Sequence, residues 1–221
     1  MFKQILSLAA VSILCFGGEG DVTPLQAQSG PPASQPQAVA ADPIPSTTFS
    51  TSNVRLHGVD FSGLFDGYYS FNNNHPASGL NNLYNFDDHA NQLDLNLLKL
   101  TMSHDADPIG FRLDVGFGRT LQLMHNPVPV PGEFRFVEQA YVSLKPKSAK
   151  GLQIDLGKFV TSAGSEVTET PDNFNYSRSL LFALGPYYHF GIRTSMPINS
   201  SLTVGLQLVN GWNAVVDQYG N

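Results

Sequence analysis

Charge, cysteine and tryptophan are all scarce in this chain of 221 residues. Charged residues make up only 14% of it, the net charge is −6, and no run of Lys and Arg is present to displace counterions from nucleic-acid phosphates. The single cysteine, Cys15, lies in an apolar segment near the N-terminus, so the rest of the chain offers no disulfide framework, cysteine zinc site or thiol nucleophile. We therefore expect no nucleic-acid partner and no thiol chemistry.

Long hydrophobic runs are also missing, apart from a short one at the N-terminus. Lys3 followed by the apolar stretch 5–16 is typical of a secretory signal, with Ala27 as one cleavage point. The stretch is too short to span a membrane as a helix. Lipidation of Cys15 is the weaker interpretation, because a leucine precedes it where a small residue is expected. The sequence predicts a signal peptide over residues 1–27.

Residues 28–56 are rich in Pro, Ser, Gln and Ala and hold few large apolar side chains. A segment of this composition does not bury enough surface to fold by itself. We expect it to be an extended periplasmic linker, followed by one domain over residues 57–221.

From residue 57 onward, apolar residues fall on alternate positions. In 57–71, for example, Val59 and Phe61 alternate with Asp60 and Ser62. A period of two residues predicts a β-strand with one apolar and one polar face, and the abundance of Phe and Tyr favours strands as well. The same pattern recurs in segments 111–118, 152–157, 188–196 and 202–208.

Two further strands are irregular. In 92–104 the phase changes near Leu97 and Leu98, and in 134–145 Glu138 falls among the apolar positions. Either irregularity predicts a β-bulge or a misassigned register.

The links between these strands alternate in length. The short links are residues 105–108, 146–150 and 197–201, and the long links are residues 72–91, 120–132 and 161–185. Bacterial outer-membrane barrels have short periplasmic turns and longer external loops, whereas a soluble sandwich need not alternate. The sequence predicts an all-β, antiparallel, up-and-down transmembrane β-barrel, with an ordinary soluble β-fold as the alternative.

The predicted strand number is odd. About seven strands follow residue 57, whereas single-chain bacterial barrels have an even number. We therefore expect an N-terminal fragment of a larger barrel, with a truncated gene or sequence, whose strands form an open curved sheet with two unpaired edges.

The most specific motifs lie in the last third of the chain. A Gly-Lys-Phe strand end at 157–159 is followed by Gly164 and Glu166, then by Asn-Tyr-Ser-Arg-Ser at 175–179; Pro186 begins the next strand, and Asn-Gly-Trp occupies 210–212. This order resembles the β-barrel porin family that includes OmpL-like proteins of the bacterial outer membrane. The resemblance implies an outer-membrane channel and identifies no solute.

Charged residues suggest how such a pore would be lined. If the long link 161–185 folds into the pore, four of its residues are candidates for a charged constriction: Glu166, Glu169, Asp172 and Arg178. A solvated loop is the alternative. The strand phase predicts eight lumen-facing charges, which are Asp60, Asp66, Asp94, Arg112, Asp114, Arg135, Asp155 and Arg193. Their mild acidic excess would weakly favour cations.

Aromatic residues gather near the predicted strand ends, as in the interfacial girdles of membrane barrels. The candidates for such a girdle are Tyr69, Phe71, Phe159, Tyr187, Tyr188 and Trp212.

Enzymatic motifs are not supported. Glu166 and Glu169 as a glycosidase pair, or Ser177 within a hydrolase triad, have no framing motif around them. The histidines are scattered, and a short local cluster such as Asp87-Asp88-His89 does not by itself supply the convergent geometry that a metal needs. We expect no enzymatic activity, no cofactor and no metal.

The predicted function is a porin-like channel for passive diffusion of small hydrophilic solutes or ions, in contact with outer-membrane lipid. The alternative is a non-conducting barrel that acts as a surface binding or adhesion scaffold. Assembly into a homo-oligomer stays open.

Overall fold

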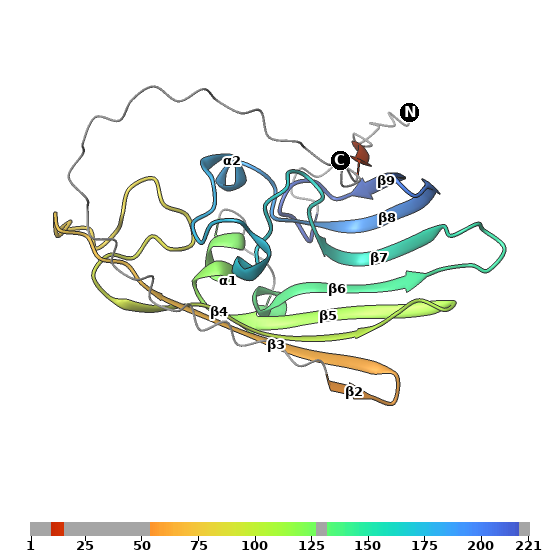
Figure 1. Cartoon of the computed structure of the whole chain (residues 1–221), viewed down its shortest axis with the longest axis horizontal. Coiled ribbons are helices and arrows are strands. Elements are labelled where there is room, and N and C mark those ends of the chain that lie inside the picture. Colours follow the sequence, from red (N-terminus) through yellow and green to blue (C-terminus); the bar gives the residue numbers. More distant parts are fainter. Residues whose placement is uncertain (1–9, 16–53, 127–131, 217–221) are drawn as a thin grey trace, which may run out of the picture.

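A computed structural model describes residues 10–15, 54–126 and 132–216, with only the backbone described for 10–15. These residues form one nine-stranded antiparallel sheet, in the order β1-β9-β8-β7-β6-β5-β4-β3-β2 (Figure 1). The strands are β1 (Ala10–Cys15), β2 (Val54–Leu56), β3 (Val59–Tyr69), β4 (Leu93–His104), β5 (Ile109–Phe117), β6 (Val137–Leu144), β7 (Gln153–Val160), β8 (Tyr188–Asn199) and β9 (Leu202–Val209). The helical turns are α1 (Arg119–Met124), η1 (Gly132–Phe136), η2 (Thr170–Asp172) and α2 (Leu180–Ala183).

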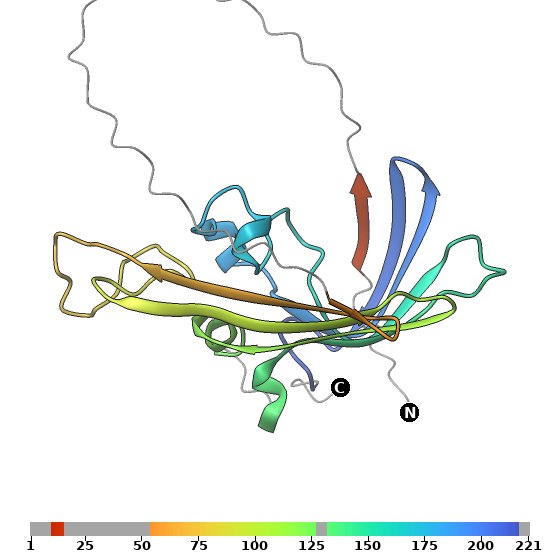
Figure 2. The same ribbon diagram turned by 60° about the horizontal axis from the view of Figure 1, so that its bottom comes forward.

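From β2 to β9 each strand pairs with the next one along the chain, and short and long links alternate. The sheet is curved and stays open, with β2 at one edge and β1 at the other (Figure 2). The predicted fold class, an all-β up-and-down antiparallel sheet that is curved and open, is confirmed. No helix in the described ranges is long and apolar enough to cross a membrane.

The sheet begins slightly earlier than the sequence pattern indicates. Strand β2 lies within the last residues of the segment expected to be a linker, and it forms a hairpin with β3. The two turn residues, His57 and Gly58, have φ of 50° and 84°, which suits a two-residue hairpin turn. Residues 28–53 lie outside the described residues. So does most of the predicted signal peptide, although β1 falls within it and pairs with β9.

The two faces of the sheet differ sharply in polarity. On the outer face a row of apolar side chains runs across five strands in direct register, and each is at least 37% exposed: Phe111, Val142, Leu156, Ile192 and Leu208. On the opposite face, called the inner face below, the matching row is polar and consists of Ser143, Asp155, Arg193 and Gln207. A soluble sandwich would bury the apolar face against a second sheet, but the described residues form only one sheet.

Both predicted irregularities are β-bulges. The pairing of β3 with β4 skips Asn96, and the pairing of β5 with β6 skips Glu138. Each extra residue is buried together with the residue that follows it, Leu97 and Gln139 respectively. The bulges therefore turn two consecutive side chains away from the outer face, which strict alternation does not allow.

On the side of the long links, strands β5 and β6 do not extend as far as β4. Strand β4 pairs with β5 only from Leu98 onward, although β4 begins at Leu93. Helix α1 follows β5 directly and lies against this part of β4, which pairs with β3 but not with β5, and Thr120 Oγ1 donates there to Asn96 Oδ1 at 2.8 Å. Gly118 starts the helix at φ 133°, and a Cβ there would lie 2.5 Å from the Asn96 carbonyl oxygen, so only glycine fits. Helix α1 thus takes the place of strand pairing in this part of the sheet.

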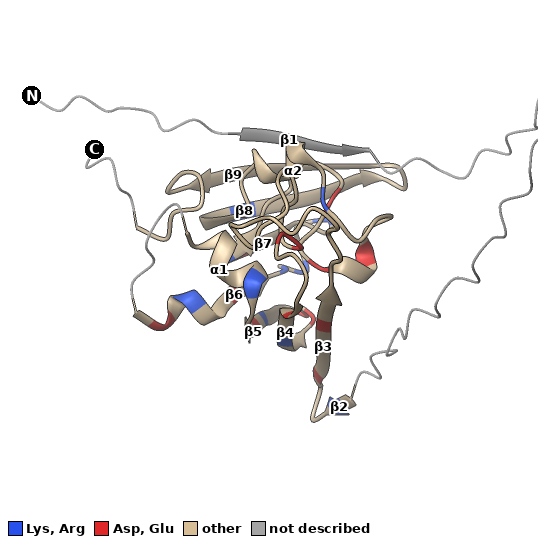
Figure 3. Cartoon of the chain, turned by 90° about the vertical axis from the view of Figure 1, so that its left-hand side faces the viewer, with Lys and Arg blue, Asp and Glu red and all other residues tan. Residues whose placement is uncertain are grey.

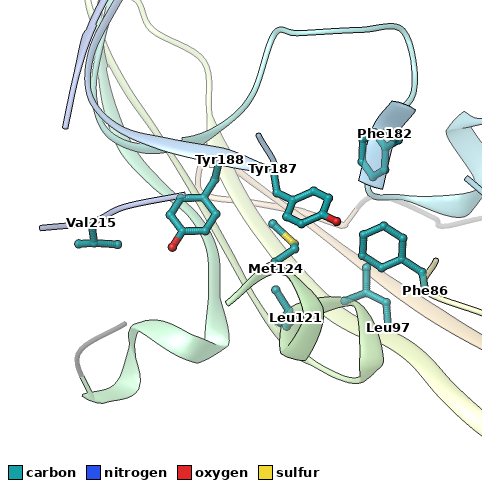
Figure 4. Packing of buried hydrophobic residues seen from close by; sticks show 8 residues of the cluster. All are labelled: Phe86, Leu97, Leu121, Met124, Phe182, Tyr187, Tyr188 and Val215. Atoms are coloured by element: carbon teal, nitrogen blue, oxygen red, sulfur yellow. The ribbon is translucent and has the colours of Figure 1, made fainter. Parts of the chain in front are cut away.

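The apolar core lies at the same end and is built from links and strand ends (Figure 4). Its members are Phe86, Leu97, Leu121, Met124, Phe182, Tyr187, Tyr188 and Val215. The rings of Phe86, Phe182 and Tyr187 contact one another at centroid distances of 5.6 to 5.7 Å. At about 1.5–3 kcal/mol for each large side chain fully buried, this core holds the long links firmly against the sheet.

Three of the six aromatics predicted for the interfacial girdle are inside the molecule instead. Phe159, Tyr187 and Tyr188 are at most 8% exposed, so their assignment to the outer surface is wrong. The reason is that the long links and α1 cover the strand ends, which alternation along a single strand does not reveal. Tyr69, Phe71 and Trp212 are more than half exposed, and their interfacial role stays a prediction.

Candidate functional site

The inner face carries a buried charged cluster centred on Lys99. Its Nζ lies 3.0 Å from Glu138 Oε2 and 3.9 Å from Asp114 Oδ2, and it also donates to Glu169 Oε1. The side chains of Glu138 and Asp114 are fully buried, and that of Lys99 is 5% exposed. Burying charges is costly unless they are paired, so this arrangement depends on the ammonium being present among the carboxylates.

Local structure explains how these residues meet. Lys99 pairs across β4 and β5 with Gly116, which has no side chain, so the lysine has free room on the inner face. Asp114 comes two residues earlier on β5 and points to the same side. Glu138 reaches the cluster because it is the bulged residue of β6. Glu169 arrives from the β7–β8 link, just ahead of η2.

The three carboxylates have the spacing of a metal site, since one oxygen from each of Asp114, Glu138 and Glu169 lies within 4.8 Å of the others. The Lys99 ammonium contacts all three, however, so the chain supplies its own cation there. Burial raises the pKa of Glu169, but Lys99, a backbone hydrogen bond and Arg112 together lower it by more, and the net pKa lies below the ordinary value. The cluster is a built-in ion pair network.

The β7–β8 link is fastened across the inner face. Asp66 of β3 accepts hydrogen bonds from Thr170 Oγ1 and from the Tyr176 hydroxyl, the latter at 2.8 Å. Asn96, the bulged residue of β4, donates to the same carboxylate at 2.7 Å. Side chains more than a hundred residues apart therefore hold the link on the polar side of the sheet, and Figure 2 shows this link and α2 on the concave side.

The four constriction candidates occupy different places and do not form one ring. Glu169 joins the Lys99 cluster. Arg178 is buried, donates to the carbonyls of Thr168 and Tyr176, and lies 5.2 Å from the centre of the Phe86 ring. Glu166 accepts hydrogen bonds from the backbone and hydroxyl of Ser179 at the start of α2.

The fourth candidate, Asp172, is exposed and lines a small cavity beneath the link. Of the four, Glu169 and Asp172 line this cavity on the polar side of the sheet.

The predicted lumen-facing charges are mostly found on the inner face. Asp66, Asp114 and Asp155 are buried there. Arg112 Nε donates to both carboxylate oxygens of Asp114, at 3.1 and 3.0 Å. Arg193 donates to Asp155 from Nε at 3.0 Å and from Nη2 at 2.8 Å. In Figure 3 the Lys and Arg positions of the described residues lie interspersed with the Asp and Glu positions.

Three of these candidates lie toward the ends of the sheet. Asp94 pairs with His89 at 2.5 Å, and Asp60 lies 3.6 Å from Arg55 at the β2–β3 hairpin. Arg135 is exposed in η1 with its Cζ 4.7 Å from the Phe136 ring centre. Its lumen-facing assignment is wrong, because it assumed a strand, and a 3-10 helix with three residues per turn does not alternate between two faces.

Sequence reasoning missed several buried charged residues. Lys99 lies just beyond the irregular part of β4, and Glu138 was noticed only as a misfit in the strand pattern. Lys158 falls among apolar positions but is fully buried, with Nζ 2.8 Å from His125 Nε2 and 4.0 Å from the centre of the Tyr188 ring. Burial, with a smaller contribution from Lys158, lowers the pKa of His125 to about 4. A charged residue in an apolar phase is the signal that could have identified Glu138 and Lys158.

Comparison with known proteins gives one match. Residues 58–221 match the family described as "Putative beta-barrel porin-2, OmpL-like". No curated protein and no solved structure matches the chain.

Proposed function

Because the chain belongs to the family of OmpL-like β-barrel porins, we propose that it forms a channel of the bacterial outer membrane for passive diffusion of small hydrophilic solutes and ions. The main support for this proposal is the difference in polarity between the two faces of the sheet. Its exposed face is a continuous apolar surface, and its covered face is charged and hydrogen-bonded. An exposed apolar face of this extent suits lipid, and the polar face suits a water-filled interior.

The β7–β8 link gives the interior its shape. Its hydrogen bonds to Asp66 and its ion pair with Lys99 hold it across the inner face, where it narrows the space available to a solute. Four carboxylates, Asp114, Glu138, Glu169 and Asp172, lie near two cations, Lys99 and Arg112. This excess of negative charge supports a weak preference for cations.

Planar-bilayer recording on the refolded full-length protein tests the channel. We expect discrete conductance steps, and a reversal potential in a salt gradient that shows modest cation preference. A protein that folds, as judged by its band shift on unheated gels, but gives no steps would overturn the proposal.

A second candidate is a non-conducting surface scaffold. The observation that favours it is the apolar core of Phe86, Met124, Phe182 and their neighbours, which packs the long links together at one end of the sheet. Folded protein without conductance would point to this function, because small barrels are filled by side chains in the same way.

The proposal includes export and processing. Residues 1–27 act as a signal peptide and the residues between it and β2 as a periplasmic linker, so the mature protein should begin at Gln28 and be recovered with outer membranes. Mass spectrometry of the N-terminus and cell fractionation test both points. Recovery in the aqueous fraction after detergent-free washing would favour a soluble β-fold instead.

A further inference from the structure

We propose that the cavity beneath the β7–β8 link binds a small zwitterionic solute, a free α-amino acid, whose carboxylate meets Arg112 and whose ammonium meets Asp172. The inference rests on the proposed channel function, because it names a class of solute that the interior would hold.

The cavity has a volume of about 180 Å³ and lies between two different parts of the chain. Its wall comes from β3, β4 and β5 and includes Ser62, Thr101 and Arg112. Its roof is formed by the link and includes Pro171 and Asp172. A space of this size, with polar groups on both sides, matches a solute of glycine or alanine size.

The wall presents unused hydrogen-bond donors. Arg112 engages Asp114 through Nε alone, so its two terminal nitrogens have no partner among the described residues, and its side chain is 37% exposed. Ser62 and Thr101 are direct partners in the β3–β4 register, and neither hydroxyl has a hydrogen bond within the described part of the chain. A guanidinium with free terminal N–H groups is well suited to bind a carboxylate.

The roof presents an unused acceptor. The exposed Asp172 carboxylate has no ion pair or side-chain hydrogen bond in the described ranges. The nearby Lys99 is not available to a solute, because it already contacts three carboxylates. Asp172 is therefore the group that remains to receive an ammonium.

The charges around the cavity discriminate between classes of solute. A simple anion at Arg112 would be repelled by Asp114, Glu169 and Asp172. A simple cation near Asp172 would leave the terminal nitrogens of Arg112 without a partner. A zwitterionic α-amino acid meets both requirements, because it brings an acceptor for Arg112 and a donor for Asp172 on two groups that share one carbon atom.

Ligand-observed NMR titration of the refolded full-length protein in detergent micelles tests the site. Glycine should bind, and acetate and methylammonium should each bind at least about tenfold more weakly, since each loses one charge-assisted contact. Arg112→Gln and Asp172→Asn should each weaken glycine binding by about tenfold or more. The charge-matched controls, Arg55→Gln and Asp105→Asn outside the cavity, should bind glycine like the parent protein.

The outcomes separate this inference from the channel proposal. Conductance steps without glycine binding would overturn the amino-acid site and leave the channel intact, whereas glycine binding without steps would do the opposite. Acetate binding as tightly as glycine, with Asp172→Asn unchanged, would mean that the cavity selects carboxylates and not zwitterions. If Arg112→Gln fails to fold, Arg112→Lys keeps the charge but lacks the forked donors, and undiminished glycine binding to it would refute the claim that the terminal nitrogens of the guanidinium hold the carboxylate.

Discussion

Replacing Lys99 with methionine should be among the most destabilising single changes on the inner face. The substitution keeps the length of the side chain but removes the cation from a cluster in which the Glu138 and Asp114 side chains are fully buried. Breaking a buried ion pair by removing one partner costs about 3–5 kcal/mol, because a charge is left without compensation. Here more than one carboxylate loses its partner, so we expect the upper part of that range.

The measurement is a urea titration of the refolded protein in lipid vesicles, followed by far-UV circular dichroism. The control is Lys147→Met, which breaks a surface pair with Asp107 whose two side chains are 77% and 80% exposed, and which should cost less than about 1 kcal/mol. Adding Glu138→Gln to Lys99→Met should recover part of the loss. Equal midpoints for the Lys99 and Lys147 variants would refute the reasoning that the cluster depends on its ammonium.

Three further expectations follow from the two faces and from the links. Ile192→Arg on the apolar face should lower the free energy of unfolding by about 2–4 kcal/mol if the residue lies near the bilayer midplane, whereas Leu83→Arg in an exposed link should change it little. Equal losses in the same urea titration would mean that the outer face does not contact lipid. The pKa of His125 is about 6.5 in the unfolded chain and about 4 in the folded protein, so between these values only the unfolded chain takes up the proton. The free energy of unfolding is therefore unaffected by this group above about pH 6.5 and falls by about 3 kcal/mol as the pH is lowered toward 4. His125→Gln should flatten that part of the stability profile, and an unchanged slope would contradict the assignment. Tyr176→Phe removes one anchor of the β7–β8 link on Asp66, so single-channel recordings should show larger and noisier steps; unaltered steps would mean that this contact does not hold the link in the pore.

The architecture could be predicted because its physical basis is local. Alternation of apolar and polar residues indicates which face of the sheet each side chain occupies. The length of a link indicates whether it lies at the end of the sheet with short turns or at the end with long loops. Even the bulges at Asn96 and Glu138 left a trace, since each shifts the phase of its strand by one residue.

The buried charges could not be predicted in the same way, because they depend on contacts between distant segments. Nothing near Lys99 in the sequence indicates that Glu169, seventy residues later, will reach it. Tyr188 occupies a position that alternation assigns to the lipid face, yet the segments around His125 and Asn213 cover it. Arg135 was misplaced for a related reason, since a helical turn replaced the expected start of a strand.

The position of α1 bears on how the protein would tolerate insertions. A link between two fully paired strands can usually be lengthened without disturbing the sheet, because its closure entropy grows only slowly with length. The link that contains α1 differs, since Gly118 and Thr120 dock on the bulge at Asn96, where β4 has no pairing with β5. An epitope tag placed around Ser78 in the β3–β4 link would lengthen a loop, whereas the same tag beside Thr120 would open a gap in the sheet itself.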